Sequence, residues 1–364
     1  MAEAKRRILS IDALRGLDMI WLVGLASFFT VLNKAWPNAF TDLMAKQVTH
    51  TSVGLHLYDL IFPTFVFLAG CSWPFSLASQ QAKGATDGQI LRRILKRFAI
   101  LFVLGAVLFG LPSFDFAHVR FNSILGRVGF GWAVAAIALL YAPRKWWVTG
   151  VVVFVLYWIA MVLAPLAVNP LKSPWEWGPH NMINIVDNWI GKPNPDKWGG
   201  EGFFTAIGCI PTAFLGMWAG LVLKRTDLEP ERKTMRLFAG AAVLGAAGAV
   251  AWPFCPCMKP MWNPTFILVA GAISTGLLAL FHQIIDVWGF TAWSFPFRLI
   301  GMNAITIYVL SPFVSFTYIS HKLLCGVEKF APENWTAVID KGGHLLVVLW
   351  FLHFLYKKNL FIRV

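Results

Sequence analysis

The chain has 364 residues, of which 57% are hydrophobic and 13% are charged. Soluble globular domains carry about 25% charged residues, so this composition excludes an ordinary water-soluble enzyme and favours a protein embedded in lipid. The formal net charge of +13 could suggest a nucleic-acid partner, but the placement of the basic residues excludes one, because they follow a membrane-topology pattern.

Long apolar segments recur along the whole chain. A membrane-spanning helix needs about 20 predominantly apolar residues, and ten segments approach this length. We therefore predict an all-α fold, a polytopic membrane helix bundle that forms a single transmembrane domain over residues 1–364. The predicted spans are 10–32, 58–79, 93–111, 122–142, 147–168, 202–223, 236–254, 264–286, 297–319 and 336–356.

The links between these spans differ in basic charge. If the N-terminus is cytoplasmic, 19 of the 31 Lys and Arg residues lie in the inner links or at the adjoining span ends, and 10 lie in the outer links or at the adjoining span ends. Because Lys and Arg are enriched in cytoplasmic loops, both termini are expected to be cytoplasmic. Three longer links, 33–57, 169–201 and 321–335, then lie on the outer side. The Trp-rich second link fits either a membrane interface or a sugar-stacking surface. The five Cys residues form neither a disulfide framework nor a zinc framework, so no metal is expected.

The first predicted span contains three charged residues in "SIDALRGLDMIWLVG", namely Asp12, Arg15 and Asp18. Their three-residue steps place them on one broad helix face, and a carboxylate three positions from an arginine can pair with it. Charges within lipid are costly, so they are expected to face the bundle interior. They predict an ionic element that lines a polar cavity open to the cytoplasm. The alternative is an interfacial pair at the start of the helix.

The stretch "VTHTSVGLHLYDLIFPTFVFLAG" places two histidines and an aspartate before the second apolar run. His50 precedes Asp59 by nine residues and His56 precedes it by three. Histidine titrates near neutral pH and can take a proton from an amine or a hydroxyl, while Asp59 favours a helix N-terminus. These residues predict an acid–base site on the outer side of the membrane. An ordinary polar loop at the interface is the alternative.

Three further polar residues interrupt later spans or begin them. Arg127 lies about one turn inside the fourth span beside Gly126, where it would bind phosphate or carboxylate, or else snorkel to the surface. Glu201 begins the sixth span at a position that suits helix capping. Asn303 lies within the ninth span, and a membrane-buried amide needs a partner, either a ligand or another helix.

Six motifs in order resemble a known family over essentially the whole chain. They resemble bacterial relatives of heparan-α-glucosaminide N-acetyltransferase, which are transmembrane acyltransferases. The motifs are "SIDALRGLDM", "HLYDLIFPTFVFLAG", "EGFFTAIGCIPTAFLGMWAG", "CMKPMWNPTFILVAGAIS", "FRLIGMNAITIYVLS" and "YKKNLFIRV".

This resemblance implies the transfer of an acetyl group from cytoplasmic acetyl-CoA to an amino sugar of the glucosamine type on the periplasmic side of a bacterial inner membrane. The family's functional histidine precedes "DLIFP" in a pattern like His-x-x-Trp-x-Gly. Here the spacing is one residue shorter, and Val53 or Gly54 stands where tryptophan is common. The resemblance assigns catalysis to His50, with His56 as the second candidate. The charge of Asp59 is expected to orient or stabilise the imidazolium.

The resemblance also implies a set of residues that bind the acetyl-CoA co-substrate. Asp12 and Arg15 match the family's Asp-x-x-Arg-Gly, and Asn303 matches its Gly-Met-Asn. Arg127 joins them as a candidate phosphate or amide partner, chosen from its position in the fourth span. The expected partners are membrane lipids, acetyl-CoA, a small sugar acceptor and a second copy of the chain in a homodimer.

The alternative function is a membrane transporter for an amino sugar or N-acetylglucosamine. Asp12, Arg15 and Asn303 would serve a binding site at the bilayer midplane equally well. The residues specify neither the acceptor nor the order of events, which is either direct attack on the thioester or transfer through an acetyl-histidine.

Overall fold

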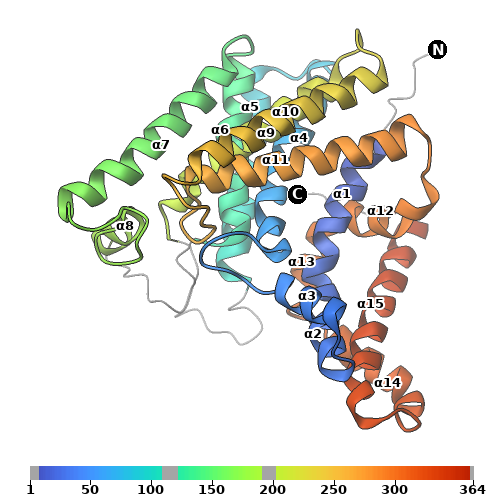
Figure 1. Ribbon diagram of the computed structural model, residues 1–364. Helices are drawn as coiled ribbons and strands as arrows, with labels where there is room; N and C mark the ends of the chain where they lie inside the picture. Colours follow the sequence, from blue (N-terminus) through green and yellow to red (C-terminus); the bar gives the residue numbers. More distant parts are fainter. Residues whose placement is uncertain (1–7, 109–121, 191–201, 361–364) are drawn as a thin grey trace. The chain divides into compact units, whose positions relative to one another are not determined.

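The computed structural model describes residues 8–108, 122–190 and 202–360 (Figure 1). Helices joined by turns make up these residues, and none of them forms a strand. The predicted all-α membrane bundle is therefore confirmed. Glu201 and the rest of 191–201, within the predicted second outer link, lie outside the described residues. The described residues group into two compact units; a single transmembrane domain over 1–364 stays a prediction.

Eight helical segments in the described part of the chain are long and apolar enough to cross a membrane, which confirms a multi-pass membrane protein. They are Leu9–Ala35, Leu57–Gln81, Ile124–Tyr141, Trp146–Val168, Thr205–Lys224, Pro230–Ala251, Pro264–Val287 and Glu333–Lys357.

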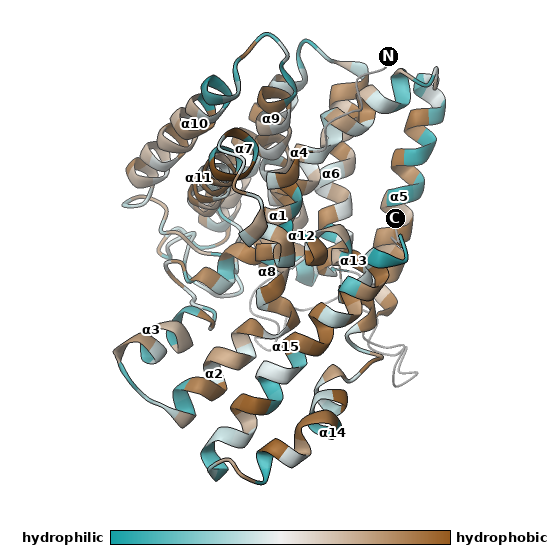
Figure 2. Cartoon of the chain, turned by 90° about the vertical axis from the view of Figure 1, so that its right-hand side faces the viewer, coloured by the Kyte–Doolittle hydropathy of each residue, from teal (hydrophilic) through white to brown (hydrophobic). Residues whose placement is uncertain are grey.

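Two of the ten predicted spans differ from these eight. The third is the helix α5 (Asp87–Val107), whose first half carries basic residues; Figure 2 shows the alternation of hydrophilic and hydrophobic positions along α5. The ninth span, 297–319, is wrong as a single helix. It is divided into α12 (Phe295–Met302) and α13 (Ala304–Leu310), because Asn303 adopts the non-helical angles φ −121° and ψ 24°. Pro312 follows α13 closely and cannot continue it.

Unit 1 comprises Met1–His50, His56–Ile61 and Leu277–Val364. In its first segment, α1 (Leu9–Ile20) continues through a π-helical turn, Trp21–Leu25, into α2 (Ala26–Ala35), and α3 (Ala39–Gln47) follows. A 3₁₀ turn at Leu57–Leu60 lies in its second segment. The third segment holds the π-helical turn His282–Val287, the 3₁₀ turn Ala292–Ser294, α12, α13, α14 (Phe316–Glu328) and α15 (Glu333–Lys357).

The helices α1 and α12 of unit 1 pack backbone against backbone. A Cβ atom added to Gly16 would overlap the carbonyl oxygen of Phe297, and one added to Gly301 would overlap the carbonyl oxygen of Asp12. Small residues at such positions let membrane helices approach closely. This contact places the Asp12 end of α1 directly beside the end of α12 that leads to Asn303.

A distant carboxylate caps the N-terminus of α1. The backbone N–H groups of Leu9 and Ser10 donate to Oδ1 and Oδ2 of Asp286, at 3.1 and 3.2 Å. The first amides of a helix have no partner within the helix, and a negative charge is favourable at that end. Asp286 therefore joins the start of α1 to the end of the segment that follows α11.

A histidine of α15 forms a hydrogen bond to the π-helical turn that follows α1. His344 of α15 hydrogen-bonds to the carbonyl oxygen of Val23 through Nε2, at 2.6 Å, and its Nδ1 lies 3.0 Å from Oγ1 of Thr317. A π-turn leaves carbonyl groups outside the regular helical pattern, and His344 satisfies one of them. His344 therefore has a structural, hydrogen-bonding role in unit 1.

Unit 2 comprises Thr51–Leu55 and Phe62–Gly276. It contains most of α4 (Ile61–Gln81), then α5, α6 (Ile124–Tyr141), α7 (Trp146–Val168), α8 (Met182–Trp189), α9 (Thr205–Lys224), α10 (Pro230–Ala251) and the first part of α11 (Pro264–Phe281). The most apolar window of α9 is 72% buried, whereas that of α7 is 17% buried. Apolar helices that expose most of their surface suit contact with lipid, so we assign α7 to the lipid-facing side of this unit and α9 to its core.

Candidate active site

A histidine and a buried aspartate form a direct pair in unit 1. Nδ1 of His50 lies 2.7 Å from Oδ1 of Asp59. The Asp59 side chain is fully buried, whereas the His50 side chain is 58% exposed. Asp59 belongs to the 3₁₀ turn that leads into α4, and His50 follows the C-terminal end of α3. The chain therefore folds back between residues 50 and 59, so that the buried Asp59 carboxylate contacts the accessible imidazole of His50.

The backbone of the second histidine completes this arrangement. The backbone N–H of His56 donates to Oδ2 of Asp59 at 3.1 Å, so each carboxylate oxygen of Asp59 has a partner. The ring Nδ1 of His56 lies 3.0 Å from the carbonyl oxygen of Thr49, and the backbone N–H of Leu57 donates to Oε1 of Gln47 at 3.0 Å. The structure brings all three predicted residues together. The His50 ring contacts the Asp59 carboxylate, whereas the His56 ring contacts the backbone carbonyl of Thr49.

Two further features hold this loop. The ring of Tyr58 lies against the ring of His50, with 5.0 Å between their centroids. Gly54 has a positive φ of 94°, which favours glycine, and its N–H donates to the carbonyl oxygen of Cys257 at 2.8 Å within unit 2. Gly54, one of the two residues that stand where tryptophan is common in the family, therefore adopts a φ that a tryptophan side chain would strain.

The pair has the geometry of an acid–base or nucleophilic centre. An ionised carboxylate only accepts hydrogen bonds, so the proton of neutral His50 is assigned to Nδ1 by this contact. The lone pair then lies on Nε2, the nitrogen that takes up a proton or attacks an acyl carbon. The carboxylate also stabilises the positive charge that the ring acquires during such a step.

A second group of predicted residues lies along α1 and at the break between α12 and α13, also in unit 1. Arg15 donates through an Nη atom to Oδ1 of Asp12 at 3.3 Å, as the three-residue spacing predicts. Asp18 and Asn303 are buried. Among the described residues, Oδ2 of Asp18 and both amide atoms of Asn303 have no hydrogen-bond partner. Buried polar atoms without partners are costly, so this region suits a polar ligand.

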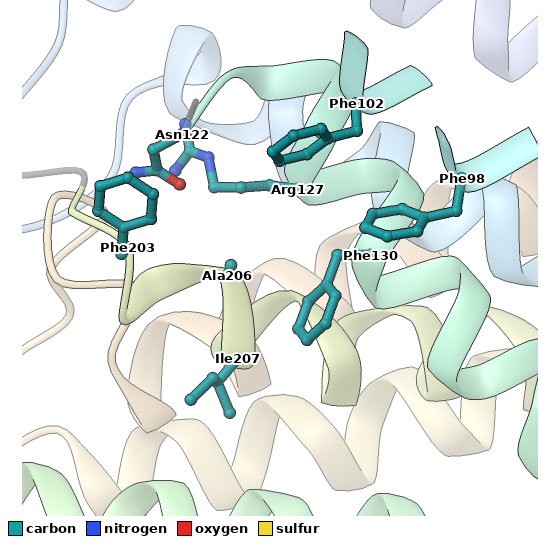
Figure 3. Close-up of a pocket in the computed structure, with 9 residues that line it drawn as sticks. Phe98, Phe102, Asn122, Arg127, Phe130, Phe203, Ala206 and Ile207 are labelled. Atoms are coloured by element: carbon teal, nitrogen blue, oxygen red, sulfur yellow. The ribbon is translucent and has the colours of Figure 1, made fainter. Parts of the chain in front are cut away.

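Arg127 lies in unit 2 and is 3% exposed, which excludes the snorkelling alternative. One Nη atom donates to Oγ1 of Thr205 at 3.3 Å, and the guanidinium carbon lies 4.4 Å from the centre of the Phe62 ring. Arg127 forms part of the wall of a pocket of about 190 Å³ between α5, α6 and α9. Figure 3 shows Asn122 and Arg127 at one end of this pocket and Phe98, Phe102 and Phe130 towards the other.

This pocket combines a polar end with an aromatic wall. A guanidinium binds phosphate or a carbonyl oxygen well, while the phenylalanines suit a narrow, largely apolar chain. The pantetheine arm of acetyl-CoA has both kinds of group, since amides alternate with short methylene chains. The lining would accept a narrow chain of this kind, and Arg127 and Asn122 are the groups that would hold the polar atoms of such a chain.

Comparisons with known proteins give a consistent relationship. No protein-family model matches the chain. Heparan-α-glucosaminide N-acetyltransferase of mouse is 23% identical to it over 433 aligned residues, covering 100% of this chain and 61% of the mouse protein. The human protein of the same name is 22% identical over 428 residues, covering 98% and 60%. The chain is similar over nearly its whole length to heparan-α-glucosaminide N-acetyltransferase. The resemblance predicted from the motifs is confirmed.

The similarity covers only part of each similar protein. The chain spans about 60% of the length of these curated relatives. Within that portion, sequence reasoning found His50, His56 and Asp59, but it missed Gln47 and Tyr58. Neither residue type indicates catalysis, and only the closed shape of the loop brings them to the pair.

Proposed function

We propose that the chain is a transmembrane N-acetyltransferase that transfers acetyl from cytoplasmic acetyl-CoA to an amino sugar of the glucosamine type on the periplasmic side of a bacterial inner membrane. The observation that carries this proposal is the 2.7 Å contact between His50 and the fully buried Asp59. It is supported by the two similar proteins, both named as N-acetyltransferases of a glucosaminide, and by the basic inner links.

The chemistry requires one proton acceptor and one leaving group. The neutral amine of the sugar attacks the thioester carbonyl carbon, a C–N bond forms, and the C–S bond to CoA breaks. Nε2 of His50 takes the proton that the amine loses and returns it to the CoA thiolate. In the two-step order, Nε2 attacks the carbonyl carbon and the CoA thiolate leaves. The amine then attacks the acetyl-imidazole, the bond between acetyl and Nε2 breaks, and the released Nε2 takes the proton that the amine loses. Asp59 stabilises the positively charged ring in either order.

The donor is held by residues away from the histidine. We assign the Arg127 pocket to a part of acetyl-CoA, because its guanidinium end and aromatic wall match amide and methylene groups. Asp12 and Arg15, beside the unpartnered amide of Asn303, are the second group assigned to acetyl-CoA. The cytoplasmic excess of Lys and Arg favours the charged nucleotide end on that side.

The test compares two histidine variants in detergent and in liposomes. His50→Ala is expected to abolish acetylation of glucosamine while leaving acetyl-CoA affinity within a few-fold of wild type. His56→Ala, whose backbone contact to Asp59 survives the substitution, is expected to retain a substantial fraction of the activity. Full activity of His50→Ala would contradict the proposal. Sugar accumulation in protein-containing liposomes without acetyl-CoA would favour the transporter instead, for which the buried atoms of Asp18 and Asn303 provide a polar interior.

A further inference from the structure

Three ligand-type side chains meet where α14 folds back against α15 in unit 1 (Figure 1). His321 and Glu328 belong to α14, seven residues apart, and Asp340 belongs to α15. Nδ1 of His321 lies 2.9 Å from Oε2 of Glu328 and 3.4 Å from Oδ1 of Asp340. One nitrogen or oxygen atom of each residue lies within 4.8 Å of the other two.

These three side chains include two carboxyl groups and one imidazole. The Glu328 side chain is 7% exposed, yet its Oε1 has no hydrogen-bond partner among the described residues, and the same holds for Oδ1 of Asp340. Within the described part of the chain, His321 is the partner that forms an ion pair with either carboxylate. Two carboxylates against one imidazole leave a negative charge at the buried Glu328 unless a proton or a cation compensates it.

We propose that His321, Glu328 and Asp340 bind a first-row divalent cation of the zinc type, which joins α14 to α15. With ligand bonds of about 2.1 Å, two donors at angles of about 90–110° lie about 3.0–3.4 Å apart. The observed separations of 2.9 and 3.4 Å match this range. Mixed nitrogen and oxygen donors favour zinc, manganese or nickel over calcium and magnesium.

The surroundings suit a bound ion. The His321 side chain is 51% exposed, so an ion reaches the group from solution. The helices already approach closely at this level, where Oγ of Ser320 donates to the carbonyl oxygen of Asp340 at 3.1 Å. The link 321–335 is predicted to lie on the outer side, so the ion would come from outside the cytoplasm.

Zinc binding tests this directly. The purified protein in detergent is freed of metal, dialysed against Zn²⁺, and analysed for bound zinc and for thermal unfolding. Wild type is expected to bind zinc at this site and to unfold at a higher temperature with it. His321→Ala and Glu328→Gln are expected to lose one equivalent of zinc and the temperature shift. Glu333→Gln, which removes an exposed acid at the start of α15, is the matched control and keeps both.

Two controls make the result decisive. His50→Ala removes the other histidine–carboxylate pair and is expected to retain the zinc-dependent shift. Metal-free unfolding temperatures identify a variant that merely fails to fold, in which case Asp340→Asn replaces it. An unchanged zinc content and shift in Glu328→Gln, or no zinc bound by wild type, would overturn the proposal. A shift produced by Ca²⁺ and not by Zn²⁺ would overturn the assignment of the ion.

Discussion

Replacing Asp59 by Asn tests the acid–base pair without changing the size of the side chain. Asp59 uses both oxygens as acceptors, one for His50 and one for the backbone N–H of His56. Asparagine offers one acceptor oxygen and one NH₂ donor. If the asparagine oxygen still accepts from the backbone N–H of His56, the asparagine NH₂ group faces Nδ1 of His50. Nδ1 must then accept a hydrogen bond, so the proton of the neutral imidazole lies on Nε2. The nitrogen that should accept the substrate proton would then be occupied.

The magnitude follows from these contacts. Loss of positioned general-base catalysis lowers kcat by about 10²–10⁴-fold, or about 2.7–5.4 kcal/mol of transition-state stabilisation. Folding is expected to lose about 1–3 kcal/mol, since in the other orientation a donor faces the buried N–H of His56. Because the proposal places the donor at other residues, the KM for acetyl-CoA is expected to change by only a few-fold.

The assay is acetyl transfer to glucosamine with labelled acetyl-CoA, measured for Asp59→Asn, for His50→Ala and for the double variant. If the two residues act as one unit, the double variant is no slower than His50→Ala alone. A kcat of Asp59→Asn close to that of wild type would refute the reasoning. If the loss of kcat in the double variant equals the product of the losses in the two single variants, Asp59 acts independently of His50.

Three further substitutions test other contacts. Arg127→Met keeps the length of a buried side chain but removes its charge, so the KM for acetyl-CoA should rise at least tenfold; an unchanged KM would remove the pocket from the donor site. Gly16→Ala places a methyl group on the carbonyl oxygen of Phe297 and should cost about 1–3 kcal/mol in thermal unfolding, whereas Gly88→Ala, with open space around its Cβ, should not. Asp286→Ala leaves two amides at the start of α1 without a cap and should cost about 0.5–2 kcal/mol; equal stability would mean that water replaces the carboxylate.

The contact between His50 and Asp59 was predictable because the two residues lie close together along the chain. His50, His56 and Asp59 fall within ten residues at the start of an apolar run, so chain connectivity alone keeps them near one another. The pairing of Asp12 with Arg15 was predictable for the same reason, since a helix places residues three apart on one side.

Long-range contacts were not predictable in this way. The capping of α1 by Asp286 joins residues 276 and 277 positions apart, and no local pattern indicates it. The ninth span was wrong because an apolar run predicts a helix but does not show where one is broken; the asparagine that interrupts it was read as a residue within the helix. His321, Glu328 and Asp340 were also missed as a group, because α15 supplies one ligand and α14 the other two.

The backbone contact between α1 and α12 has a consequence for how unit 1 moves. Gly16 and Gly301 each lie against a carbonyl oxygen of the other helix. This close packing hinders sliding, so we expect α1 and α12 to move together as one rigid body. The break at Asn303 lies directly after that rigid body, and its non-helical backbone makes it the natural pivot. We therefore expect any movement of α13 relative to α1 and α12 to be centred on Asn303.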